Sequence, residues 1–87
     1  MLPINNEKKI KWACRRGMLE LDCTLVPFFE NRYASLTDQL KEDFVELLEN
    51  SDPDLYSWIM GFSHNYPLQS TEIIKSIHKY IRDLQSV

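Results

Sequence analysis

The stretch Arg15-Arg16-Gly17-Met18-Leu19-Glu20-Leu21-Asp22 predicts a tight turn between two helices. A glycine directly after two arginines is typical of a helix C-terminus, because glycine enters the left-handed conformation at little cost. We therefore expect Gly17 to end the first helix. The arginines would lie near the negative end of one helix dipole, and Glu20 and Asp22 near the positive end of the next. Helix termination alone does not require so many charges around one glycine, and this excess indicates a functional surface.

Apolar residues recur at three- and four-residue steps on both sides of this turn, which predicts short amphipathic helices along the whole chain. Pro27 lies inside the second of them and cannot bond the carbonyl of Cys23, so we expect a kink or a break there. Such short helices are marginal alone and depend on packing against one another. The predicted fold is therefore all-α, a compact bundle of five short helices. The expected helices are an N-terminal one capped by Asn5 or Asn6 and ended by Gly17, then about 18–31, 38–49 and 52–61, and a last one capped by Ser70 or Thr71 and running to Leu84.

The apolar stripes of these helices define the candidate core, since one face of each helix must be buried against the others. Along the chain the stripe residues are Ile10, Ala13, Cys14, Met18, Leu21, Leu25, Phe28, Phe29, Leu40, Phe44, Leu47, Leu48, Leu55, Trp58, Ile59, Phe62, Ile73, Ile74, Ile77, Ile81 and Leu84.

A few positions near the stripes carry separate expectations. Cys14 and Cys23 both fall in apolar helical patterns, where a cysteine behaves as a small buried hydrophobe. Trp12 lies off its stripe and either packs against a neighbouring helix or stays exposed for a partner. The acidic residues of the third helix are expected to face water. They are Glu42, Asp43, Glu46 and Glu49.

The segment Asp52-Pro53-Asp54 predicts the start of the fourth helix. Asp52 is suited to the cap position and Pro53 to the first helical position, where the missing amide proton costs nothing. Asp54 would then complement the positive end of the helix dipole.

Length and composition limit the organisation of the chain. Its 87 residues allow one domain, residues 1–87, with a single modest core. No apolar run approaches the roughly 18 residues that a membrane span needs. The first residues show no basic start followed by an apolar segment, so we expect no secretory signal, no insertion into a membrane and a cytoplasmic protein.

The net charge of −3 hides a strong asymmetry. Residues 1–17 carry five basic residues against one acidic residue, whereas residues 20–54 carry ten acidic residues against two basic ones. A nucleic-acid binder gains most of its affinity from neutralised phosphates, which the acidic middle of this chain would repel. The charge pattern therefore disfavours nucleic acid and favours a protein partner with charges of its own.

Motifs for catalysis and for cofactor binding are missing from the sequence. It contains neither a GxxxxGK[ST] loop nor a GxGxxG fingerprint, and no nucleophile stands beside a base. His64 and His78 have no second metal ligand three or four residues away. We therefore expect no enzymatic activity, no metal site and no stably bound cofactor.

The run from Trp12 to Asp22, followed by Pro27-Phe28-Phe29 and by Asp52-Pro53-Asp54-Leu55-Tyr56-Ser57-Trp58, closely resembles the succinate dehydrogenase FAD assembly factor family. The resemblance covers about residues 5–62. It implies a five-helix protein that binds the flavoprotein subunit of succinate dehydrogenase, and of fumarate reductase, and promotes covalent attachment of FAD to a histidine of that subunit. The FAD would be held by the partner, and we expect the assembly factor itself to be a monomer.

The RGxxE signature of that family matches Arg16, Gly17 and Glu20, and the resemblance implies that these residues contact the partner. We add five further residues near these positions as candidates for contact with the partner. Local physics offers a second interpretation, in which Gly17 is only a helix stop and Asp52 a helix cap. The candidate partner-binding residues are Arg16, Gly17, Glu20, Arg15, Asp22, Asp52, Asp54 and Trp58.

Two other functions are compatible with the sequence. The chain could be an antitoxin-type protein that binds and inhibits a toxin affecting cell division. It could also carry FAD directly, although it contains no dinucleotide-binding motif to hold the flavin.

Overall fold

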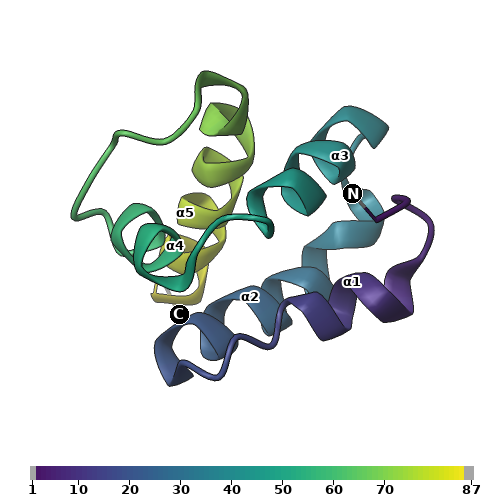
Figure 1. Ribbon diagram of the computed structural model, residues 1–87, viewed down its shortest axis with the longest axis horizontal. Coiled ribbons are helices and arrows are strands. Elements are labelled where there is room, and N and C mark those ends of the chain that lie inside the picture. Colours follow the sequence, from purple (N-terminus) through teal and green to yellow (C-terminus); the bar gives the residue numbers. More distant parts are fainter. Residues whose placement is uncertain (1, 86–87) are drawn as a thin grey trace.

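The computed structural model describes residues 2–85, and this part of the chain is helical without strands (Figure 1). The prediction of an all-α fold with five helices is confirmed. The prediction of one domain over residues 1–87 extends beyond the described residues at both ends. The helices are α1 (Glu7–Ala13), α2 (Leu19–Arg32), α3 (Asp38–Leu47), α4 (Asp52–Ile59) and α5 (Thr71–Gln85), with 3-10 turns at Tyr33–Ser35 and Leu68–Ser70.

The helices pack around a centre that every one of them helps to fill. In Figure 1, α1 and α2 run side by side along one edge, and α4 and α5 lie together on another. Helix α5 packs against α2, α3 and α4. Across residues 2–85, none of the helices has the length and apolar character needed to cross a bilayer.

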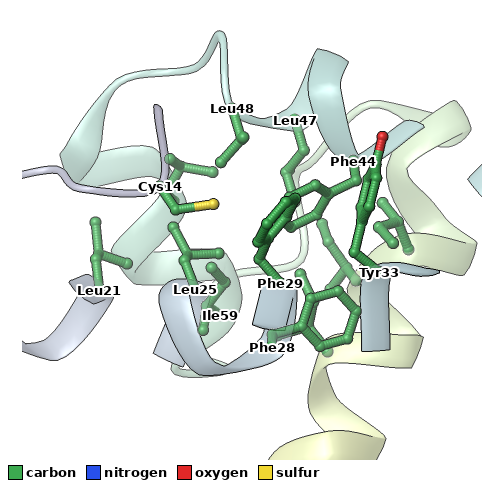
Figure 2. Packing of buried hydrophobic residues seen from close by; sticks show 14 of the residues in the cluster. Cys14, Leu21, Leu25, Phe28, Phe29, Tyr33, Phe44, Leu47, Leu48 and Ile59 are labelled. Carbon is green, nitrogen blue, oxygen red and sulfur yellow. The ribbon is translucent and has the colours of Figure 1, made fainter. Parts of the chain in front are cut away.

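Aromatic rings make up the middle of the core. Figure 2 shows the rings of Phe28, Phe29, Tyr33 and Phe44 gathered together. The ring centroids of Phe29 and Tyr33 are 4.8 Å apart, and those of Phe28 and Phe44 are 5.5 Å apart. The buried Tyr33 hydroxyl donates to the Ile4 carbonyl at 2.6 Å, which ties the N-terminal segment to the core. The buried aromatic set therefore joins α2, α3 and the chain before α1.

The helix starts follow the predicted capping rules with one correction. The Asn6 side chain accepts the Lys9 N–H and caps α1, and Thr37 caps α3. Helix α4 is capped by Ser51, whose Oγ accepts the Asp54 N–H at 3.4 Å, so the assignment of the cap to Asp52 was wrong. Asp52 is instead the first residue of the helix, and its carboxylate is occupied by another partner described below.

Helix α2 continues through Pro27 as one element from Leu19 to Arg32. Of the two outcomes expected at Pro27, a break into two pieces is excluded. The proline removes one backbone hydrogen bond, while Leu25, Phe28 and Phe29 on either side of it are buried in the core. Tertiary packing therefore holds the helix together where its own hydrogen bonding is weakened.

Two apolar residues expected in the core are exposed. Phe62 is 72% exposed because the chain turns away after α4, so that helical periodicity no longer describes its position; its ring lies 5.8 Å from that of Tyr56. Leu84 is 58% exposed in the last turn of α5, although Ile73, Ile74 and Ile77 of the same stripe are fully buried. The other stripe residues are buried, or partly buried and packed against the core.

Two further expectations about burial were wrong. Cys23 is exposed, while Cys14 is fully buried. Cys23 is two residues from both Leu21 and Leu25, and residues two apart on a helix point in different directions. Asp43 is buried rather than water-facing, and its carboxylate accepts a hydrogen bond from Gln39 Nε2 at 3.1 Å. A partner one helical turn away thus makes this burial possible.

Candidate partner-binding turn

Residues 14–18 form the turn between α1 and α2, which we call the Gly17 turn. Helix α1 ends at Ala13, earlier than expected, so Gly17 is not the residue that ends it. The Cys14 N–H donates to the Ile10 carbonyl and the Arg15 N–H to the Trp12 carbonyl, both at 3.1 Å. Carbonyl groups of the last helical turn are therefore satisfied before the chain reaches the glycine.

Gly17 does have the predicted left-handed backbone, with a φ of +78°. It is exposed, and a Cβ built on it would meet no heavy atom within 4 Å. Glycine is therefore needed here for its backbone conformation and not for lack of internal room. The outer surface of the turn carries no side chain at this point.

The Arg16 side chain forms four hydrogen bonds within the molecule, which we call the Arg16 clamp. Its Nε donates to Asp52 Oδ1 at 2.7 Å, and its Nη2 donates to the Asn50 carbonyl at 2.9 Å. Its Nη1 donates to the carbonyls of Leu48 at 2.8 Å and Ala13 at 3.2 Å. Only 18% of the side chain is exposed. The clamp therefore fastens the Gly17 turn to the α3–α4 connection, residues 48–51, and to the first residue of α4.

The backbone of the turn is fastened to α2 as well. The Arg16 N–H donates to Asp22 Oδ1 at 2.6 Å. Asp22 is half-buried in the first turn of α2, where a carboxylate also suits the helix dipole. The Gly17 turn is thus held from two directions, by a side chain on one and by its own amide on the other.

Among the charged candidates from Arg15 to Asp22, the exposed ones are Arg15 and Glu20. Both are exposed, and neither side chain forms an ion pair among the described residues 2–85. They lie on either side of Gly17 in the sequence, Arg15 before it and Glu20 in the first turn of α2. The surface at the turn therefore presents an exposed arginine and an exposed glutamate beside Gly17, which has no side chain.

Large apolar side chains also surround the turn. Trp12 is 78% exposed, so of its two expected outcomes the exposed one is found. It lines a surface hollow together with Lys8, Lys11 and Arg15. Leu19 is 73% exposed and was not among the candidates. Its signal in the sequence is a large apolar residue directly after the turn and outside the buried stripe of α2.

The two remaining candidates belong to α4. Asp54 is exposed in the first turn of α4, two residues beyond Asp52. Trp58 is only 5% exposed, and its Nε1 donates to Asn65 Oδ1 at 2.7 Å. The structure thus brings Arg16, Asp22 and Asp52 together around the turn, whereas the Trp58 ring is part of the core.

The Cys14 thiol is the buried ionisable group at the start of the turn. Burial raises the pKa of the Cys14 thiol to about 12, against an Arg16 charge that lowers it, so the thiol is protonated at neutral pH. Throughout residues 2–85, no three His, Cys, Asp or Glu side chains come close enough to hold a metal ion. What the turn can do is present a fixed backbone and oriented charges to another molecule.

The fold and this turn define a small helical protein with a rigid, charged surface turn. A family model described as flavinator of succinate dehydrogenase matches residues 8–81. The chain belongs to this family of FAD assembly factors for succinate dehydrogenase, and the resemblance noted in the sequence is confirmed.

Relatives and a solved structure agree with this assignment. The FAD assembly factor SdhE of Vibrio cholerae is 56% identical over 61 residues, which is 70% of this chain and 71% of that protein. The FAD assembly factor SdhE of Yersinia pseudotuberculosis is 47% identical over 76 residues, or 87% and 86% of the two chains. The solution structure of a UPF0350 protein is 44% identical and superposes with a TM-score of 0.72, covering 100% of this chain and 90% of that chain.

Proposed function

We propose that this protein binds the flavoprotein subunit of succinate dehydrogenase, and that of fumarate reductase, and promotes covalent attachment of FAD to the bound subunit. The observation that carries the proposal is the Gly17 turn, an exposed left-handed glycine held by hydrogen bonds on two sides in a chain of the FAD assembly factor family. Because Gly17 has no side chain, the backbone of a partner can come close to the turn at this position.

The Gly17 turn suits a specific partner because hydrogen bonds within the chain already hold its backbone. Rigid groups lose little conformational freedom when they meet a partner, which leaves more of the contact energy for affinity. Arg15 and Glu20 are accessible and can form charge-assisted hydrogen bonds with opposite charges on the flavoprotein. Trp12 and Leu19 add exposed apolar surface on the flanking helices.

The proposed action is that of a holding chaperone rather than an enzyme. The flavoprotein holds the FAD and supplies the groups that react, and this chain binds no cofactor stably. It favours the arrangement of the flavoprotein in which the flavin and its acceptor residue are correctly placed. Binding that arrangement about 3 kcal/mol more tightly than the others would shift its population more than about a hundredfold. We further propose that it acts as a cytoplasmic monomer.

In-gel flavin fluorescence tests the proposal directly. Covalently attached FAD stays with the succinate dehydrogenase large subunit after denaturation, whereas noncovalent FAD is lost. We expect a fluorescent band in cells that contain this protein and a strongly reduced band in cells that lack it. Equal bands in the two strains would contradict the proposal.

Capture of bound partners separates this function from the antitoxin alternative. Tagged protein should retain the flavoprotein subunit. Recovery of a small toxin instead, together with unchanged flavin fluorescence, would favour the alternative.

A further inference from the structure

Two adjacent arginines, Arg15 and Arg16, lie at the Gly17 turn, and the structure places them in different surroundings. Arg15 is exposed on the surface hollow that it shares with Trp12 and two lysines. Arg16 points into the molecule and is fastened to the α3–α4 connection and to Asp52. Charge and helix periodicity do not assign them different roles, because they are neighbouring residues of the same type.

We infer that Arg16 is a positioning residue, which fixes the Gly17 turn from within, and that Arg15 is the arginine that meets the flavoprotein. This inference rests on the proposed function. It divides the charged signature of the turn into an internal part, the Arg16 clamp, and an external part, formed by Arg15 and Glu20.

The hydrogen-bond inventory of Arg16 is the first support. A guanidinium group has five N–H donors, and four hydrogen bonds to protein acceptors are formed. Little donor capacity is left for another protein, and 18% exposure of the side chain leaves little surface for contact. A flavoprotein that used this guanidinium would have to break bonds that hold the turn in place.

The acceptors of the clamp are the second support. Leu48 and Asn50 offer backbone carbonyls at the end of α3 and in the connection that follows, and Asp52 adds a charge. These acceptors lie more than 30 positions away from Arg16 in the sequence. The planar guanidinium reaches them together because its donors point in fixed, divergent directions, whereas a lysine ammonium is a single point of charge. Lysine at this position would keep the charge and lose the clamp.

Binding measurements at several salt concentrations test the inference. The full-length chain is titrated with the purified flavoprotein subunit of succinate dehydrogenase, and the variants are Arg15→Ala, Arg16→Ala and Arg16→Lys. Lys79→Ala is the matched control, because it also removes one positive charge but from an exposed position on α5. Removing a charge that touches the partner weakens the salt dependence of Kd, whereas loss of an internal clamp raises Kd without changing that dependence.

For Arg15→Ala, we expect Kd to rise about fivefold or more and to become less sensitive to salt. For Arg16→Ala and Arg16→Lys, we expect similar increases of about tenfold or more, with the same salt dependence as the wild-type chain. Faster hydrogen exchange of the amides at residues 16–18 should accompany both Arg16 variants, including any that is too unstable for titration. The control should bind like the wild-type chain.

Two results would overturn the inference while leaving the proposed function intact. One is wild-type affinity in Arg16→Lys, which would mean that only the charge at this position matters. The other is an Arg16→Ala variant whose Kd loses salt dependence as that of Arg15→Ala does. A wild-type chain that does not bind the flavoprotein would overturn the proposed function and the role given to Arg15.

Discussion

The two glycines of this chain have nearly the same backbone conformation and different surroundings. Gly17 has a φ of +78° and Gly61 a φ of +82°, both are exposed, and a Cβ on either would meet nothing within 4 Å. Gly61 follows Met60, the residue that caps the C-terminus of α4. Its N–H donates to the Trp58 carbonyl and the Phe62 N–H donates to the Ser57 carbonyl, which is the hydrogen-bond pattern of a Schellman motif.

Gly17 has no comparable task in ending a helix. Helix α1 ends at Ala13, and hydrogen bonds to its last turn come from Cys14 and Arg15. The left-handed glycine is followed by α2 and preceded by a residue that is fastened to α4. Gly61 is therefore explained by local backbone chemistry, whereas the role of Gly17 lies outside the helix that precedes it. The proposed function supplies this role, since the bare turn would lie against the flavoprotein.

The largest effect is expected when each glycine is replaced by arginine, in the variants Gly17→Arg and Gly61→Arg. Each substitution forces an L-residue into the left-handed region at a cost of about 1–2 kcal/mol without an internal clash. Both variants should therefore remain folded, with similarly lowered thermal midpoints. Gly17→Arg should abolish flavoprotein binding and covalent flavin fluorescence, because the new side chain occupies the partner-facing surface.

Gly61→Arg should support flavin attachment at the wild-type level. If Gly17→Arg also did so, or if both variants failed equally while folded, the different roles of the two glycines would be refuted.

The next largest effect concerns the stability of the Gly17 turn. Arg16→Ala removes a charge whose side chain is only 18% exposed and leaves the acceptors of its four hydrogen bonds without their partner. We expect the free energy of unfolding to fall by about 2–3 kcal/mol, whereas Arg15→Ala should change it by less than about 0.5 kcal/mol. Urea denaturation of the two variants measures both values. Equal stability losses would show that the clamp contributes no more than an exposed arginine.

A smaller effect tests whether the start of α4 supports the Gly17 turn. Ser51→Ala removes the cap next to Asp52, and Thr37→Ala removes the cap of α3. Each should reduce stability by about 1 kcal/mol. Only Ser51→Ala should also speed hydrogen exchange at Arg16 and Gly17, because Asp52 anchors the clamp. The same exchange rates in both variants would mean that the turn does not depend on α4 in this way.

The smallest expected effect is a pH dependence of the stability, which reports on how Cys14 is packed beneath the turn. The thiol of the fully buried Cys14 has its pKa raised from 9.0 to about 12 by burial. The folded chain therefore keeps a proton that the unfolded chain releases above pH 9, so stability decreases as pH rises from about 9 to about 12. Between pH 8 and pH 9 the loss should be only about 0.4 kcal/mol.

Chemical denaturation at several pH values measures this dependence. Cys14→Ala should reduce the slope, because the buried thiol is its source. A Tyr33 contribution of the same sign follows at higher pH, because burial raises the pKa of its hydroxyl as well. An unchanged slope in Cys14→Ala would mean that this thiol is not held in an apolar environment.

Much of the fold could be predicted from the sequence because its determinants are local. The periodicity of apolar residues predicted five helices, and Asn6 was one of the two residues expected to cap the first of them. Errors arose where local rules do not distinguish neighbours, as between Ser51 and Asp52, or where a stripe extends beyond the elements that cover it, as at Phe62 and Leu84. Periodicity gives the face of a helix and not the extent of what packs on it.

The candidate turn was also found from the sequence, because the glycine and the four charged residues lie within a few positions of one another. The sequence did not show that these charged residues have different surroundings. Arg15 and Arg16 are neighbours of the same type, and only the acceptors at Leu48, Asn50 and Asp52 distinguish them. The exposure of Leu19 was missed for a related reason, since it depends on what α2 packs against.

By itself, the sequence determined the helical class of this protein, the approximate positions of its helices and the left-handed glycine at its surface. These features follow from interactions between residues a few positions apart. Only the tertiary structure decided that Arg16 points inward, that Arg15 and Glu20 are exposed and that the Trp58 ring belongs to the core. The physical reason is that hydrogen bonding and burial depend on the segments that meet in space, and here the decisive segment lies more than 30 positions along the chain.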